Sequence, residues 1–152
     1  MIAFHFLSVK FKLPRRRLLK SWLKALAEAG GKRVGELSVI FCSDEELLSI
    51  NRRYLQHDYF TDIITFDYSH GNNLSGDMFI SYDTVCANAH TYRQSFDNEL
   101  HRVMAHGLLH LCGYRDATAR EQKQMRSMEN KCLKKWDELF AASLPPASGV
   151  RQ

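Results

Sequence analysis

The stretch Thr61–Ser81, TDIITFDYSHGNNLSGDMFIS, decides the fold class of this chain. Its first eight residues, TDIITFDY, are rich in β-branched and aromatic side chains and predict a strand. The polar run Ser69–Asn73 predicts a turn, and Gly76–Ser81 predicts a second strand that returns from it. The stretch therefore supplies two strands of a sheet, and the rest of the chain is interpreted around them.

Two further strands are predicted before this stretch. Alternating apolar residues predict one within residues 1–12, and Glu36–Cys42 predicts the other. Between them, apolar residues recur at helical spacing from Pro14, which suits the start of a helix, until Gly30–Gly31 stops the run. All four predicted strands thus lie in the first 81 residues.

Helices are predicted between the strands and throughout the second half. Ser43 and Glu46 form a capping box, which predicts a helix with one face made of Leu47, Ile50 and Tyr54. Three helices follow the last strand: about Asp83–Gln94, Asp97–Cys112 with Asp97 as its cap, and a helix that starts at a second capping box, Thr118 and Glu121, and continues to about Phe140.

This order favours an α+β fold in which helices cover a small four-stranded mixed sheet. At 152 residues the chain has the length of one ordinary domain. We predict a single domain over residues 1–142. Residues 143–152, rich in Pro, Ser and Gly, are predicted to form a disordered tail.

Composition favours a soluble cytoplasmic protein with polyanionic partners. No apolar run approaches the roughly 20 residues that a membrane span needs. The four cysteines form no C-x-x-C pair and are expected to be reduced. The net charge is +4, and basic residues gather near the N-terminus and along the last helix. The latter group is Arg120, Lys123, Arg126, Lys131, Lys134 and Lys135.

The motif that carries chemistry is HGLLHLCGYRD, His106–Asp116. Residues four apart on a helix project from one face, so His106 and His110 are able to present two nitrogens to one metal ion. Gly113 allows the chain to turn back and bring Asp116 to the same ion. The sequence therefore predicts a metal site at a helix C-terminus. Two imidazoles and one carboxylate leave a position for water, which is typical of a catalytic site.

Zinc is the metal that these ligands favour, with nickel, manganese and iron as alternatives. The H-E-x-x-H metallopeptidases place a glutamate directly after the first histidine as the general base. Gly107 occupies that position here, which argues against a peptidase unless the base comes from elsewhere. His101 points away from the pair, and His57, His70 and His90 show no ligand spacing.

The chain resembles the YbeY endoribonuclease family, the bacterial ribosomal-RNA maturation factors. The family signature H-G-x-L-H-L-x-G-Y-D-H corresponds to the motif above, and N-x-x-Y/F-R-x-x-D-x-x-T-D/N-x-L-S-F corresponds to Asn51–Phe66. Its G-D-[ILV] strand resembles Gly76–Met78. The resemblance covers most of the chain and implies an α+β fold with a four-stranded sheet and one Zn²⁺.

Three positions depart from the family pattern. The third histidine falls on Asp116, which is a competent oxygen ligand, and the residue before it is Arg115. The arginine that serves the phosphate in the family falls on Leu55. Arg52, one helical turn earlier, and Arg115 are our candidates for phosphate stabilisation, with Arg53 as an alternative to Arg52. Thr61, Asp62 and Thr65 are predicted to bind the RNA.

The resemblance implies a single-strand-specific endoribonuclease that matures the 3′ end of 16S rRNA and takes part in ribosome quality control. Its partners would be single-stranded RNA, ribosomal RNA and the small ribosomal subunit. The nucleophile is left open between water and the RNA 2′-hydroxyl. The main alternative is a ribosome-associated RNA-binding assembly factor with a structural metal and little or no catalysis.

Overall fold

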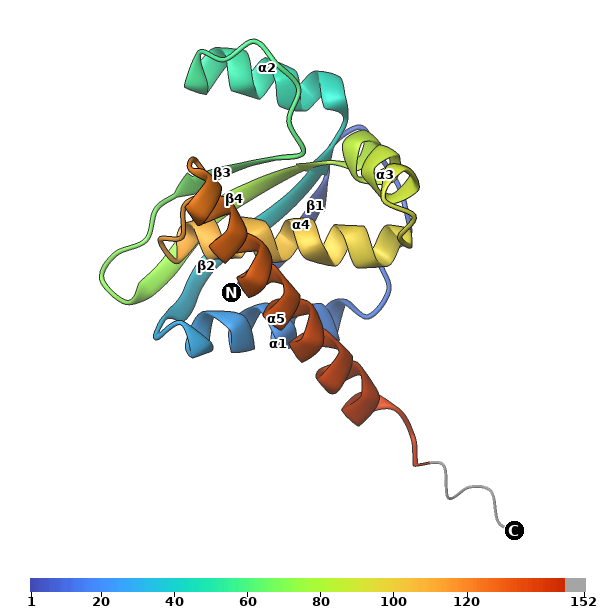
Figure 1. Cartoon of the computed structure of the whole chain (residues 1–152). Coiled ribbons are helices and arrows are strands. Elements are labelled where there is room, and N and C mark those ends of the chain that lie inside the picture. Colours follow the sequence, from blue (N-terminus) through green and yellow to red (C-terminus); the bar gives the residue numbers. More distant parts are fainter. Residues whose placement is uncertain (147–152) are drawn as a thin grey trace.

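A four-stranded sheet with the order β1-β2-β4-β3 forms the centre of the computed structural model, which describes residues 1–146 (Figure 1). The strands are β1 (Ile2–Phe6), β2 (Arg33–Cys42), β3 (Ile63–Asp67) and β4 (Asn73–Ser81). β1 and β2 are parallel, as are β2 and β4, whereas β3 and β4 are antiparallel. The predicted small mixed sheet is therefore confirmed.

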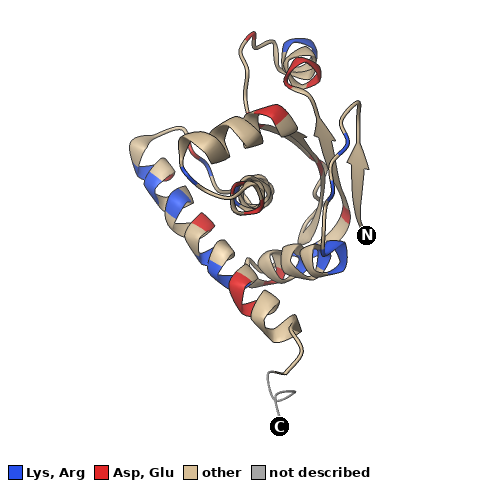
Figure 2. Cartoon of the chain, turned by 90° about the vertical axis from the view of Figure 1, so that its right-hand side faces the viewer, with Lys and Arg blue, Asp and Glu red and all other residues tan. Residues whose placement is uncertain are grey.

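Helices cover both faces of this sheet. On one face lie α1 (Arg16–Ala29) and α4 (Phe96–Leu111), with α5 (Ala119–Ser143) packed over them. On the other face, α2 (Asp44–Leu55) contacts β3 and β4. α3 (Tyr82–Thr91) follows β4 and packs against α4, with its buried Val85 in the same core cluster as α1 and α4. Figure 2 looks along α4 and shows it enclosed by the sheet, α1 and α5. The α+β class is confirmed.

The alternation of side chains along the strands divides the core into two clusters. Leu74, Met78 and Ile80 of β4 belong to the main cluster with α1 and α4, whereas Phe79 packs against the smaller cluster beneath α2. Ten of the sixteen residues of α4 are buried. This central helix is therefore held rigidly, and so are the side chains that project from its exposed end.

Both capping boxes are confirmed, but one predicted cap is wrong. Ser43 with Glu46 begins α2, and Thr118 with Glu121 begins α5, each with both reciprocal hydrogen bonds. α4 is capped by Ser95, whose side chain accepts from the Asn98 backbone N–H, and not by Asp97. A side chain caps from the residue before the first helical one, and Asp97 already lies within the first turn.

Several predicted boundaries shift. β1 ends at Phe6, well before residue 12, since Ser8 turns the chain with a positive φ of 55°. α1 starts at Arg16, after Arg15 has taken a left-handed conformation with φ 57°. β3 begins only at Ile63. Tyr54, predicted on the buried face of α2, is 60% exposed, with its ring against that of Phe66.

The last helix is longer than its sequence pattern suggested. α5 continues to Ser143, which is the first residue of the predicted tail, and residues 147–152 of that tail lie outside the described part. The basic residues predicted along this helix are all exposed, and Figure 2 shows blue segments along the length of α5. Among residues 1–146, no helix combines the length and the apolar character that crossing a membrane requires.

His101 also belongs to α4, but its side chain is buried in the core and does not join His106 and His110. Its ring lies 4.3 Å from the Trp136 ring and 5.6 Å from the Trp22 ring, centroid to centroid. Burial lowers the pKa of His101 to about 4. The imidazole is therefore neutral in the folded protein at pH values where an ordinary histidine is charged.

This burial predicts a specific loss of stability in acid. Below pH 6.5 the unfolded chain binds a proton at His101 that the folded chain does not bind until about pH 4. The free energy of unfolding should therefore fall by roughly 3 kcal/mol across this window because of this residue. Urea unfolding at pH 7 and pH 4.5 should show a smaller fall for His101→Phe than for the wild type. Equal falls would contradict the assignment.

Candidate metal centre

His106 and His110 lie one turn apart at the C-terminal end of α4 and project from the same side. Their Nε2 atoms are 2.9 Å apart, and their ring centroids are separated by 4.5 Å. Both rings are half-buried. The helical spacing alone produces this approach, as the sequence predicted.

The turn after α4 brings the third predicted ligand to the pair. Gly113 has a φ of 104°, in the left-handed region that favours glycine, and its N–H donates to the His110 carbonyl at 3.0 Å. The chain then reverses and places Asp116 Oδ2 3.1 Å from His106 Nε2 and 3.3 Å from His110 Nε2. The three residues are the group of ligand atoms that the described chain offers to a metal ion.

These three atoms fit the requirements of a divalent ion. Their mutual separations are 2.9, 3.1 and 3.3 Å. A tetrahedral zinc with bonds of about 2.0–2.1 Å separates its ligand atoms by roughly 3.3 Å. Two imidazole nitrogens and one carboxylate oxygen are also a donor set that borderline metals accept. The geometry and the chemistry of the group thus agree with a metal centre.

Glu129 on α5 orients the His106 ring through its Nδ1 atom, on the opposite side of the ring from the predicted metal position. Its Oε2 lies 2.7 Å from His106 Nδ1, while its Oε1 accepts from Arg102 Nη1 at 3.0 Å. The carboxylate is buried, with a residue exposure of 6%. A proton held on Nδ1 leaves the Nε2 lone pair of His106 for the metal. Sequence analysis did not find this residue. The available signal was a lone carboxylate on the buried stripe of α5, between Met125 and Cys132.

The same contact determines the charges at the site. Burial favours neutral His106, but the hydrogen bond and charge of Glu129, with Asp62 and Asp116, outweigh burial and raise its pKa. Burial likewise opposes ionised Glu129, but hydrogen bonds from His106 and Arg102 lower its pKa. Glu129 is therefore the ionised partner, and the His106 Nδ1–H donates to it.

The three ligand atoms form part of a cleft of about 470 Å³. The predicted RNA-binding residues Thr61, Asp62 and Thr65 all lie on its wall, at the start of β3. Burial raises the pKa of Asp62, and the charge of His106 partly opposes this. The full lining is Asn51, Leu55, His57, Tyr59, Thr61, Asp62, Ile63, Ile64, Thr65, His106, His110 and Asp116.

The two predicted phosphate-binding arginines lie outside this lining. The Arg52 side chain is exposed and pairs with Asp58. Arg115 lines a separate hollow with Gly30 and Tyr114. Their role at a phosphate stays a prediction. Leu55 lines the cleft at the position where the family pattern has arginine.

Gly107 lies where α4 packs closely against the sheet. A Cβ atom at this position would lie 2.6 Å from Ile63 Cδ1 and 2.7 Å from Met78 Sδ. Both distances are far below van der Waals contact, so no larger side chain fits without movement. The glutamate that a metallopeptidase carries after its first histidine would therefore have to displace the ends of the Ile63 and Met78 side chains here.

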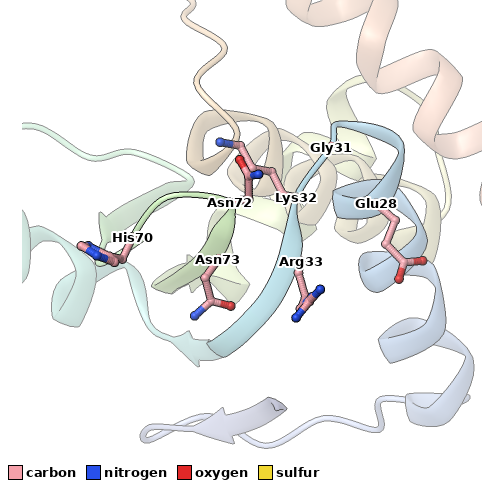
Figure 3. Close-up of a pocket in the computed structure, with 7 residues that line it drawn as sticks. All are labelled: Glu28, Gly31, Lys32, Arg33, His70, Asn72 and Asn73. Carbon is pink, nitrogen blue, oxygen red and sulfur yellow. The ribbon is translucent and has the colours of Figure 1, made fainter.

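A larger hollow of about 690 Å³ lies elsewhere, where β2 and β4 begin (Figure 3). Arg33 and Asn73 face each other across these strands, and Glu28 of α1 lies opposite them. None of the three predicted metal ligands lines it. The candidate metal group therefore lies in the smaller cleft and not in this hollow.

One substitution tests the tolerance of the site for the family's usual ligand. Asp116→His should retain stoichiometric metal, because the turn at Gly113 brings residue 116 close to both histidines. The Asp116 Oδ2 atom lies 3.1 Å from His106 Nε2 and 3.3 Å from His110 Nε2, which is a suitable separation for ligands of one ion. Metal content of the purified variant, measured by mass spectrometry, checks this. Loss of the metal would show that the turn accepts only the shorter carboxylate.

Sequence comparisons with known proteins all lead to one family. The family model described as "Endoribonuclease YbeY" matches residues 7–137. Proteins named endoribonuclease YbeY are 49% identical over 132 residues in Parabacteroides distasonis and 42% identical over 146 residues in Porphyromonas gingivalis. These alignments cover 87% and 95% of this chain, and 93% and 97% of the relatives. A solution structure from Thermotoga maritima shares the fold, with a TM-score of 0.62, 23% identity and complete coverage of both chains.

Proposed function

Since the chain belongs to the endoribonuclease YbeY family, we propose that it is a metal-dependent endoribonuclease that cleaves single-stranded RNA. The observation that carries this proposal is the group of His106, His110 and Asp116 in the wall of a cleft. Three protein ligands leave a coordination position for water or substrate. The cleft supplies the space in which an RNA strand can reach that position.

The chain's own residues divide the work between metal binding and RNA binding. His106, His110 and Asp116 would hold the metal, and Glu129 keeps the Nδ1 proton of His106 in place. A divalent ion, when bound, supplies water of lowered pKa and polarises a phosphoryl oxygen. Thr61 and Thr65 offer hydroxyl groups to the sugar and phosphate.

The nucleophile is water or the RNA's own 2′-hydroxyl. In either case its oxygen bonds to phosphorus while the bond to the leaving nucleotide oxygen breaks. Attack by the 2′-hydroxyl leaves a 2′,3′-cyclic phosphate and a 5′-hydroxyl, whereas attack by water leaves no cyclic end. Mass spectrometry of the products, with a substrate carrying one 2′-deoxynucleotide at the cleaved position, separates the two routes.

We further propose zinc as the metal, the cytoplasm as the compartment, and 16S rRNA 3′-end maturation with ribosome quality control as the role. The small ribosomal subunit would then be the partner. These finer assignments rest on the resemblance of the sequence motifs. Metal analysis of the purified chain tests the first, and accumulation of 3′-extended 16S rRNA in a deletion strain tests the last.

A second candidate is an RNA-binding assembly factor with a structural metal. It is favoured by one observation, which is that no lysine or arginine belongs to the described lining of the cleft. An assay on single-stranded RNA separates the two candidates. The enzyme should lose its cleavage with EDTA and regain it with added Zn²⁺. Metal-containing protein that binds but does not cleave RNA would support the second candidate.

A further inference from the structure

The cleft contains one basic side chain besides the predicted metal ligands. Among residues 1–146, the lining includes only one other side chain with a ring nitrogen able to donate to a phosphate, that of His57, and it includes no lysine or arginine. An RNA phosphate brought to the ligand group gains negative charge as the reaction proceeds. Donors aimed at that charge are usually a large part of catalysis. His57 therefore offers such a donor in the same cleft as the predicted metal ligands.

The His57 backbone is held in position by Asn51. The His57 N–H donates to the Asn51 carbonyl at 3.1 Å, and the Asn51 side-chain amide donates to the Tyr59 carbonyl at 2.9 Å. Asn51 is only 1% exposed, although it is polar. Because the buried Asn51 side chain is hydrogen-bonded to the Tyr59 carbonyl, it fixes the loop that contains Tyr59 relative to α2. The segment after α2 is thus attached to a rigid element.

The ring of His57 is oriented by Tyr59. The two rings are stacked, with centroids 5.1 Å apart and an interplanar angle of 20°. The Tyr59 hydroxyl lies 3.0 Å from His57 Nδ1. When that hydroxyl donates to Nδ1, the ring proton of a neutral imidazole resides on Nε2. When both nitrogens are protonated, the hydroxyl accepts instead, and Nε2 again carries a proton. Nε2–H is a donor in both of these states, whereas in the remaining neutral tautomer Nδ1–H donates to Tyr59 and Nε2 accepts.

We propose that His57 Nε2–H donates a hydrogen bond to a non-bridging oxygen of the scissile RNA phosphate. His57 belongs to the cleft lining, whereas Arg52 and Arg115 do not. Tyr59 acts through His57 and is a positioning residue. The proposal rests on the endoribonuclease function proposed above. It adds a residue of this chain to the RNA-cleaving machinery.

The test uses the full chain with its metal and a fluorescent single-stranded RNA. His57→Ala should lower kcat/KM by about 10²-fold, mainly through kcat, with metal content and melting temperature unchanged. Adding Leu55→Arg to His57→Ala should restore at least about tenfold, because Leu55 lines the same cleft and a guanidinium supplies the missing donors. His90→Ala, an exposed histidine on α3, is the matched control and should retain wild-type activity.

The outcomes separate this inference from the proposed function. Wild-type protein that holds metal but cuts no RNA overturns the function, and the inference with it. Wild-type cleavage with undiminished His57→Ala cleavage overturns the inference alone. Loss of metal or of folded protein in His57→Ala would assign the residue a structural role and also overturn it. So would a failure of Leu55→Arg to restore any cleavage to His57→Ala.

Discussion

His110→Ala should lose stoichiometric metal and RNA cleavage together. The substitution removes one of three ligand atoms that lie within 3.3 Å of one another, and two ligands rarely retain a borderline metal at low concentration. Cleavage should fall by at least about 10³-fold, because the chemistry that the ion supplies is worth several kcal/mol. Alanine is a good helix former, so α4 should remain folded.

Metal content and RNA cleavage of the same preparation check this expectation. His90→Ala is the matched control, since it removes an exposed imidazole on α3 and should change neither quantity. EDTA-treated wild type should match the His110 variant in activity. A metal-free variant that cleaves RNA at the wild-type rate would exclude a catalytic metal.

Glu129→Gln should weaken metal binding by about 10- to 100-fold without removing any ligand. The Oε2 atom of this carboxylate lies 2.7 Å from His106 Nδ1 and accepts the hydrogen bond from its N–H. The contact thereby turns Nε2 towards the position of the ion. Glutamine keeps the shape but loses the charge, so it holds that proton less strongly. It also leaves the half-buried Arg102 guanidinium without its carboxylate partner. We therefore expect a loss of about 1–3 kcal/mol in the free energy of unfolding.

Zn²⁺ titration against a chelating dye measures the first effect, and urea unfolding measures the second. Glu138→Gln is the matched control because this glutamate is exposed on the same helix. The stability difference should shrink in acid. The lowered pKa of Glu129 means that its contribution is present above pH 4.5 and lost as pH falls through the folded-state pKa. If Glu129→Gln bound Zn²⁺ as tightly as the wild type, Glu129 would not orient His106 for metal binding.

Local patterns predicted most of the elements. Ser43 with Glu46, and Thr118 with Glu121, begin their helices as expected, because a capping box satisfies donors within four residues of chain. The predicted boundaries of β1 and α1 were wrong, because they depend on backbone conformations that no sequence pattern encodes. These are the positive φ angles at Ser8 and Arg15. Asp97 was a plausible cap, but Ser95, which is also a favoured cap residue, is the last residue before α4.

The sequence by itself determined the group of residues that could hold a metal ion, since His106, His110 and Asp116 lie within one helical turn and the turn that follows. Tertiary structure alone decided what surrounds them. Glu129 reaches His106 across 23 residues because α5 packs on α4. His57 lies in the cleft because the segment after α2 is fastened by Asn51. Short-range geometry follows from residue spacing, whereas these contacts depend on how separate elements pack.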